Sequence, residues 1–290
     1  PASEDELWSV SPPSFRLDLW LKEDIAEEVA RSIGYDQIPA TLPVLTSSPI
    51  FSDSAAGTLA LMDQAKDCLQ GSGLFESLNY SFTHPGFLEK LGLKSSVELM
   101  NPLSEEHKAL VPSLLPGLIQ NSLDNWNHHF GSEQPAIRLF ELRPVFSTQA
   151  PVQAVSSLET SVQESWRLSW VLSGPRYADG LRSEKGEVDF YDLKATLDTL
   201  IRQLGTKGIR YQPLSEAGSK PNGASGNSPL ASLFHLFHPG KSAIILAGNR
   251  IAGVMGMLHP AKAQELKTRG PLWMVELGLV GASFSLQEGL

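Results

Sequence analysis

The strongest constraint on the fold of this chain is a series of short stretches in which apolar and polar residues alternate. A period of two is typical of a β-strand that buries one face. Two of the stretches flank Gly248-Asn249, a pair typical of the turn in a β-hairpin. Because most neighbouring stretches could join antiparallel, the pattern predicts an antiparallel sheet. The expected strands are residues 78–82, 97–100, 137–142, 166–172, 243–246, 251–258 and 273–279.

Apolar residues at helical spacing fill the gaps between these strands. In residues 55–69 the apolar residues Leu59, Met62, Ala65 and Leu69 recur on one face, as in a helix that packs against a core. The other expected helices are residues 84–91, 114–125 and 192–204, with a short one after Pro260. Helices packed on an antiparallel sheet predict an α+β fold rather than a doubly wound parallel sheet.

The N-terminal part of the chain forms a separate, smaller pattern. Residues 15–19 alternate as a strand, and residues 23–33 change to helical spacing that Gly34 ends. Residues 39–54 are rich in proline and small polar residues, which is the composition of a linker. We therefore expect two domains, residues 1–43 and 44–290.

Composition excludes several classes of protein. The formal net charge of −9 disfavours nonspecific binding of nucleic acid by this chain alone. The single cysteine, Cys68, excludes an intramolecular disulfide and a cysteine-cluster zinc site. No apolar run approaches the ~20 residues that span a bilayer, and the polar, acidic start gives no sign of a signal peptide. We expect a cytoplasmic protein without a membrane partner.

Four acidic residues near the N-terminus could hold a metal ion. Asp24, Glu27 and Glu28 share one helical face, and Asp18 precedes them on the expected strand. Carboxylates gathered at a helix N-terminus suit a hard cation such as Mg²⁺. The same residues also fit a structural role, because Asp24-x-x-Glu27 is a variant of the capping box and Glu27 could pair with Arg31. Spacing alone leaves both readings open.

Other motifs give no catalytic centre. The glycines of residues 248–256 lie in the expected hairpin, not between a strand and a helix as a phosphate loop requires. The histidines form no HExxH motif, and no Gly-x-Ser-x-Gly of a hydrolase is present. Cys68 falls inside a predicted amphipathic helix, where a packing role is expected.

Several separated stretches, in order along about residues 8–280, resemble the β subunit of bacterial phenylalanyl-tRNA synthetases. The matching stretches are PSFRLD (13–18), EDIAEEVAR (23–31), GYDQIP (34–39), NPLSEEH (101–107), SLLPG (113–117), LFELRPVF (139–146), DFYDLK (189–194), HPGKSA (238–243) and GVMGMLHP (253–260). Each stretch alone is of modest specificity, whereas the ordered set is highly specific.

The resemblance implies a fold, an activity and partners. Residues 1–43 would be the end of a small α/β domain that carries a magnesium site, and residues 44–290 a class II synthetase-like, non-catalytic module. The module would support ATP-dependent attachment of phenylalanine to tRNA by a catalytic α subunit in an α2β2 tetramer, and would be inactive alone. The tRNA would bind to the full complex. The family's magnesium ligands match Asp18, Asp24, Glu27 and Glu28, and the metal could be shared with the α subunit.

The residues agree with a non-catalytic module. Class II synthetases hold ATP with an Arg-x-Glu on a strand, whereas the only Arg-x-Glu here, at residues 182–184, lacks a strand pattern. The chain departs from the family at Val111 and Pro112, where an Arg-Thr pair is usual. That change favours an alternative, a free-standing interaction module that reuses the fold without a role in aminoacylation, whereas the intact acidic cluster argues against this alternative. Leu61 lies off the main apolar stripe of its helix, so it is either an interface residue or a stray surface leucine.

Overall fold

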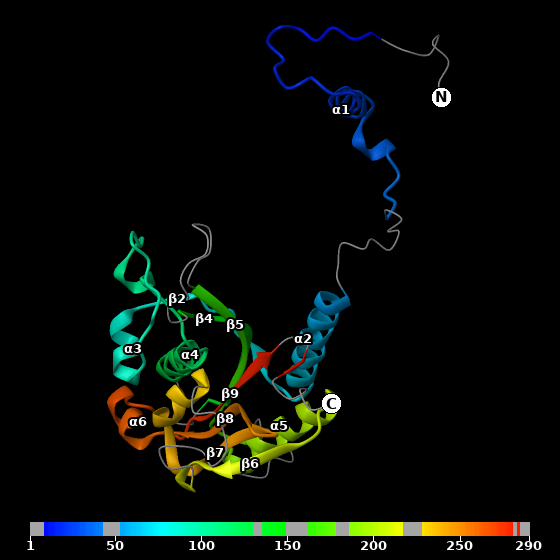
Figure 1. Ribbon diagram of the computed structural model, residues 1–290. Helices are drawn as coiled ribbons and strands as arrows, with labels where there is room; N and C mark the ends of the chain where they lie inside the picture. The colour runs from blue at the N-terminus through cyan, green and yellow to red at the C-terminus, as the bar shows by residue number, and fades with distance from the viewer. Residues whose placement is uncertain are drawn as a thin grey trace. The chain divides into compact units, whose positions relative to one another are not determined.

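Figure 1 shows a computed structural model that describes residues 9–42, 53–129, 135–148, 162–177, 186–216, 228–280 and 283–284. The chain forms two compact units, Pro1–Ile50 and Phe51–Leu290. Within the described ranges, no helix is long and apolar enough to cross a membrane. The functional assignment of residues 1–43 and 44–290 to two domains stays a prediction.

The first unit is built around helix α1 (Lys22–Ile33), which a short 3-10 turn, η2 (Tyr35–Gln37), follows. The helix predicted at residues 23–33 is therefore confirmed. It ends at Gly34, whose φ of 102° lies in a region that favours glycine. The Gly34 N–H donates to the carbonyl oxygen of Ala30 at 2.9 Å and so closes the last turn.

The strand predicted at residues 15–19 is wrong. These residues form turns, and Phe15 and Leu17 are 80% and 75% exposed. A strand is stable only when its backbone groups pair with a neighbour, and the described part of this unit contains no second strand. Alternation of apolar and polar residues is therefore not sufficient to form a strand at residues 15–19.

The second unit is organised by an eight-stranded sheet. Seven strands follow the order β1-β4-β5-β9-β8-β7-β6, and β10 (Ser283–Phe284) pairs with β9. Only the pairing of β1 with β4 is parallel. The predicted antiparallel α+β fold is confirmed. The strands are β1 (Phe75–Glu76), β4 (Ile137–Thr148), β5 (Val162–Ser173), β6 (Ile209–Pro213), β7 (Phe237–Ala247), β8 (Arg250–Leu258) and β9 (Trp273–Val280).

The predicted hairpin is confirmed, because β7 and β8 pair antiparallel around Gly248, whose φ is 57°. Two other predicted strands are shorter or missing. Of residues 78–82, only Phe82 is in a strand, since β2 (Phe82–Thr83) pairs with β3 (Ala109–Leu110) in a separate two-stranded sheet. Of residues 97–100, only Glu98 forms a bridge, to Ala109. Residues 78–82 form so little strand because Asn79 and Tyr80 bond to side chains of β4 rather than to a neighbouring strand.

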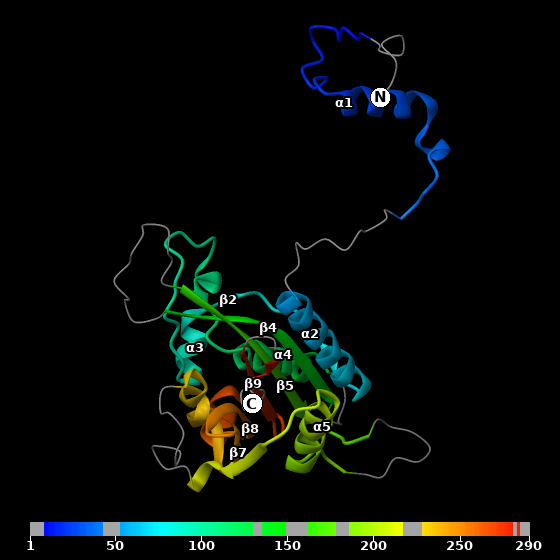
Figure 2. The same cartoon turned by 45° about the vertical axis from the view of Figure 1, so that its right-hand side comes forward.

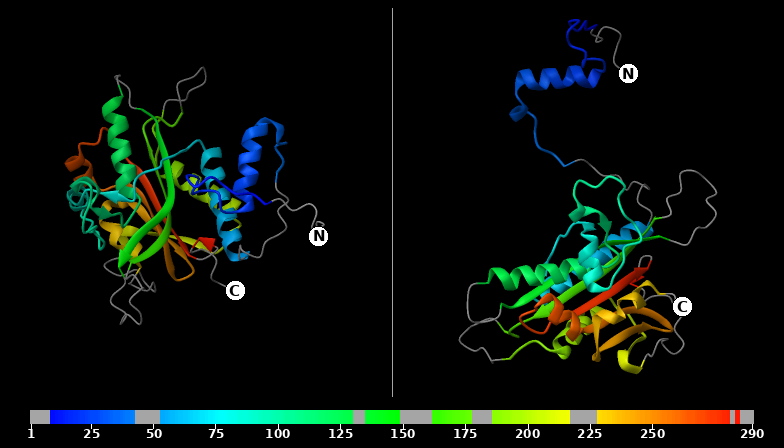
Figure 3. Two further views of the ribbon diagram at one scale, coloured as in Figure 1. Left: turned by 90° about the horizontal axis from the view of Figure 1, so that it is seen from above. Right: turned by 90° about the vertical axis from the view of Figure 1, so that its left-hand side faces the viewer.

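Helices cover both faces of the large sheet (Figures 2 and 3). On one face, α2 (Asp53–Gly71) and α5 (Phe190–Gln203) pack on a core that includes Phe140 and Trp170. On the other face, four helical segments pack on a core that includes Val171 and Met274. These segments are α3 (Pro85–Leu91), α4 (Leu115–His128), the 3-10 helix η5 (Pro229–Leu236) and α6 (Pro260–Leu266). The remaining 3-10 turns are η3 (Glu105–His107) and η4 (Leu214–Glu216).

Helix α2 bears on the prediction of an interface at Leu61. Met62, Ala65 and Leu69 are buried as predicted, but Leu61 also packs partly buried against the same core. Leu59, which the pattern places on the buried stripe, is instead 57% exposed. Leu61 is therefore not a stray surface leucine, and it gives no reason to place an interface on this helix.

Candidate functional site

Arg16 brings together two of the four predicted metal ligands. Its Nη2 lies 2.6 Å from Asp18 Oδ2 and 2.5 Å from Glu28 Oε1, although the two acids are ten positions apart in the sequence. These hydrogen bonds from Arg16 lower the pKa of Asp18 to about 2, and they also lower the pKa of Glu28. Both carboxylates are therefore ionised at neutral pH.

The other two predicted ligands lie differently. Asp24 Oδ2 accepts hydrogen bonds from the backbone N–H groups of Trp20 and Leu21, at 2.9 and 2.7 Å. Asp24 thus caps α1, but as its third residue and not as the N-cap that the Asp-x-x-Glu reading requires. Glu27 is exposed, and the predicted Glu27–Arg31 pair is wrong because Arg31 bonds to Glu28.

The donor chemistry of this cluster fits a hard cation, since ionised carboxylate oxygens are the ligands that Mg²⁺ prefers. The arrangement is that of an ion-paired cluster, with the Arg16 guanidinium between Asp18 and Glu28. Among the described residues, no three His, Cys, Asp or Glu side chains are gathered closely enough to hold a metal ion. A metal bound by these four residues would have to replace Arg16 between the two carboxylates.

A second polar cluster, which the sequence did not reveal, lies inside the large sheet. Glu276 of β9 is buried beneath the start of α4, where its Oε2 accepts hydrogen bonds from Ser113 Oγ at 2.6 Å, the Leu114 N–H at 3.0 Å and Ser169 Oγ at 3.0 Å. Arg167 Nε lies 3.9 Å from Glu276 Oε1. Burial raises the pKa of Glu276, and Arg167 and the three donors oppose that rise.

The same row of the sheet contains a second buried acid, Glu141 of β4, which is in register with Ser169. Glu141 accepts hydrogen bonds from the backbone and side chain of Asn79 and pairs with Arg143 Nε at 2.8 Å. Arg143 in turn donates to the carbonyl oxygens of Asn79 and Tyr80. The pair therefore fixes the loop that leads to β2.

The arginines of the two longest strands are all engaged internally. Arg138 donates to the carbonyl oxygens of Pro175 and Arg176, Arg143 is held by Glu141, and Arg167 faces Glu276. No guanidinium on β4 or β5 is thus left to hold a phosphate. The Arg-x-Glu at residues 182–184 lies outside the described residues.

Val111, one of the two departures from the family pattern, is buried, and its backbone bonds to two other segments of the chain. Its N–H donates to the Ser81 carbonyl oxygen at 3.0 Å, and its own carbonyl oxygen accepts the Phe146 N–H at 2.9 Å. Valine supplies no charged group at this position, so any contact that an arginine makes there is lost.

Comparisons with known proteins agree with the resemblance seen in the sequence. Residues 38–279 match the family described as phenylalanyl tRNA synthetase beta chain CLM domain, and residues 1–35 match the tRNA synthetase B5 domain. Three relatives are named phenylalanine–tRNA ligase beta subunit. They come from Geobacter metallireducens (33% identical, 89% of this chain and 29% of the relative), Methylococcus capsulatus (30%, 94% and 31%) and Geobacillus kaustophilus (31%, 91% and 30%).

The chain spans about 30% of the length of these curated relatives. Among solved structures, pyrrolysyl-tRNA synthetase from Desulfitobacterium hafniense is similar with a TM-score of 0.51. The match has 13% sequence identity and covers 80% of this chain and 74% of that one, so it shows the shared class II synthetase fold alone. Because the family model covers residues 38–279, this chain belongs to the phenylalanyl-tRNA synthetase beta chain CLM domain family.

Proposed function

We propose that this chain is the non-catalytic core of a phenylalanine–tRNA ligase β subunit, which supports ATP-dependent attachment of phenylalanine to tRNA by a separate α subunit. The observation that carries the proposal is the internal pairing of all three arginines on β4 and β5. Without a free guanidinium on β4 or β5, charge that develops on phosphates transferred over these two strands would go unstabilised. The chain alone is then inactive, and ATP and tRNA bind the full complex in the cytoplasm.

The proposed assembly is an α2β2 tetramer. Its test is light scattering of the chain alone and of the chain mixed with its cognate α subunit. We expect a mixed species with the mass of two copies of each chain. In parallel, the chain alone should give no phenylalanine-dependent exchange of pyrophosphate into ATP.

A folded chain that stays apart from a folded α subunit would favour the free-standing interaction module instead. Circular dichroism of both proteins checks that they are folded. Exchange activity by the chain alone would contradict the non-catalytic role directly. No contact in the described residues favours the free-standing module over the β-subunit core.

We propose further that Asp18, Asp24, Glu27 and Glu28 hold Mg²⁺, in the smaller domain of residues 1–43. Two features support the proposal: Asp18 and Glu28 converge on one cation, Arg16, and both are ionised at neutral pH. Bound Mg²⁺ would supply positive charge, and the four carboxylates would be its ligands. Without the metal ion, Arg16 would hold Asp18 and Glu28 together.

The magnesium site is tested by calorimetric titration of Mg²⁺ into the chain and into its mixture with the α subunit. Asp18→Asn and Glu28→Gln should each weaken binding by about tenfold or more, because each removes a charged ligand. Glu23→Gln is the matched control, since it neutralises an exposed acid of the same helix outside the set. Equal losses in all three variants, or no saturable binding in either sample, would refute the site.

A further inference from the structure

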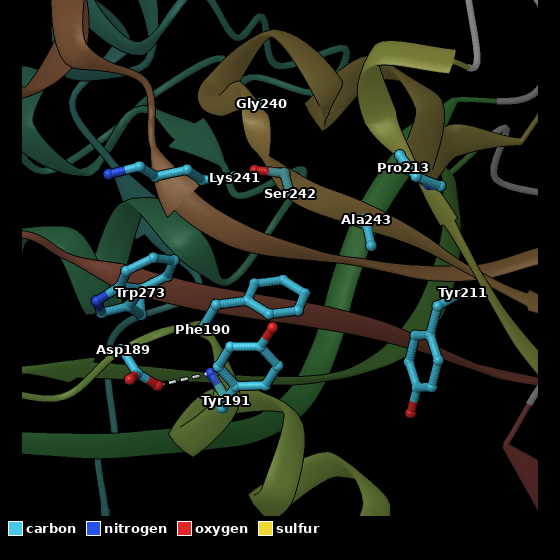
Figure 4. Close-up of a pocket in the computed structure, with 10 residues that line it drawn as sticks. All are labelled: Asp189, Phe190, Tyr191, Tyr211, Pro213, Gly240, Lys241, Ser242, Ala243 and Trp273. Atoms are coloured by element: carbon cyan, nitrogen blue, oxygen red, sulfur yellow. Dashed lines mark hydrogen bonds between the residues drawn. The ribbon is translucent and has the colours of Figure 1, made fainter.

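A cavity of about 590 Å³ opens beside the first turn of α5, next to β6, the middle of β7 and the start of β9 (Figure 4). Its volume lies within the ~300–1,000 Å³ typical of small-molecule sites. It belongs to the second unit and uses none of the residues assigned above. The described residues that line it are Asp189, Phe190, Tyr191, Tyr211, Pro213, Gly240, Lys241, Ser242, Ala243 and Trp273.

Four aromatic side chains give this pocket apolar, flat walls. The ring centroids of Phe190 and Trp273 lie 6.3 Å apart, and those of Phe190 and Tyr191 lie 5.9 Å apart, both edge-to-face. Tyr211 is fixed by its hydroxyl, which donates to Asp198 Oδ1 at 2.5 Å. Tyr191, a large aromatic residue beside the cavity, is 74% exposed. Such walls favour a flat aromatic ligand.

One cation reaches the pocket, and an irregular stretch of backbone places it there. The pairing of β7 with β8 shifts register between Phe237 and Ser242, so the residues between them leave the regular ladder. Within this stretch the Gly240 N–H donates to His238 Nδ1 at 3.0 Å. Irregularities of this kind redirect side chains, often beside functional sites. Lys241 lies in this irregular stretch, is exposed, and forms no ion pair with any residue that the structure describes.

Two of the side chains that line the pocket also carry a polar atom that lacks a hydrogen-bond partner. Trp273 Nε1 and Ser242 Oγ are buried without a hydrogen bond, in side chains that are 6% and 7% exposed. A buried polar atom without a partner is costly and calls for an explanation, such as an acceptor from a ligand. Figure 4 shows Lys241 and the indole nitrogen of Trp273 directed to the same side of the view, with Tyr211 on the other.

The charges of the pocket favour a ligand with a single negative charge. Asp189 does not pair with Lys241, since its carboxylate bonds to the Tyr191 and Asp192 N–H groups and to Arg176. Those first N–H groups of α5 are thus already satisfied and are not available to a phosphate, which commonly binds such a helix start. One lysine near an acidic side chain balances a carboxylate better than a doubly charged phosphate.

We propose that this pocket binds a small aromatic carboxylate, whose ring lies against the aromatic walls and whose carboxylate pairs with Lys241. The test titrates 2-naphthoate into the full chain and follows the indole N–H resonance of Trp273, assigned by its loss in Trp273→Phe. We expect a saturable shift of that resonance. The uncharged analogue 2-naphthalenemethanol, with the same ring, should bind at least about tenfold more weakly, since it lacks the charge-assisted bond.

Lys241→Met should weaken 2-naphthoate binding about tenfold and leave binding of the alcohol unchanged. Lys207→Met is the matched control, because Lys207 is an exposed lysine of the same unit that does not line the pocket, and it should change neither affinity. Both lysines are exposed, so the variants should fold, which their thermal unfolding checks.

Four results would overturn the proposal, three of which concern naphthoate and its alcohol. These three are no saturable shift up to about 10 mM ligand, equal affinities for naphthoate and alcohol, or no effect of Lys241→Met. Tighter binding of adenosine monophosphate than of naphthoate would also overturn it, in favour of a nucleotide site. None of these results bears on association with an α subunit, which uses a separate measurement.

Discussion

Replacing Glu276 with alanine is expected to lower the free energy of unfolding by about 3–5 kcal/mol. The variant leaves Ser113 Oγ, the Leu114 N–H and Ser169 Oγ without their acceptor in a buried site. It also leaves Arg167 without the carboxylate that faces it and opens a cavity beneath α4. Urea unfolding followed by circular dichroism measures the loss.

Glu276→Gln separates the role of the acceptor from that of the charge. The amide keeps an oxygen for the three donors, so it should cost much less than alanine. Burial raises the pKa of Glu276 above its unfolded value, so the folded protein holds the proton more tightly than the unfolded chain. The wild type should therefore lose stability relative to Glu276→Gln as pH rises from about 4.5 towards neutrality. A loss in Glu276→Gln as large as in Glu276→Ala would instead show that the charge opposite Arg167 dominates.

The second large effect is expected for Gly256→Ala in β8, at about 2–4 kcal/mol of lost stability. A Cβ at this position would lie 2.0 Å from Ser242 Oγ and 2.5 Å from Ser242 Cα, so either β7 or β8 must move. The φ of 150° is also one that side chains rarely adopt. Denaturant unfolding measures the change.

Gly57→Ala is the matched control for that substitution. Gly57 lies in helix α2, and a Cβ there would meet nothing within 4 Å. Alanine also has the higher helix propensity, so stability should stay unchanged or rise by up to about 1 kcal/mol. A Gly256→Ala variant as stable as this control would show that the two strands separate easily.

Local patterns predicted those elements whose signals lie within the element itself. The helix at α5 was visible in the sequence because Leu193, Leu197 and Leu200 share a face, and the β7–β8 hairpin because Gly248 permits its turn. The strand expected at residues 15–19 failed because its stability depends on a partner that no local pattern supplies. The shortened strand near β2 failed for a similar reason, since Glu141 and Arg143 of β4 hold that loop.

The candidate sites show the same division. The spacing of the acids indicated a cluster on α1, but not that Arg16 would join Asp18 to Glu28, since that contact depends on how the preceding turns fold back. Glu276 was detectable in principle, as a charged residue between Val275 and Leu277 in an apolar strand. A charge at such a position signals a buried partner, but only the tertiary fold identifies Arg167 as that partner.

The lengths of the outermost strands limit how this chain can aggregate. The large sheet is bounded on one side by β1, which has two residues, and on the other by β6, which has five and ends in Pro213. Growth of cross-β fibrils requires a long edge with free N–H and C=O groups, and proline has no N–H to offer. The large sheet therefore gives other molecules little template for strand addition, even though its inner strands are long and apolar.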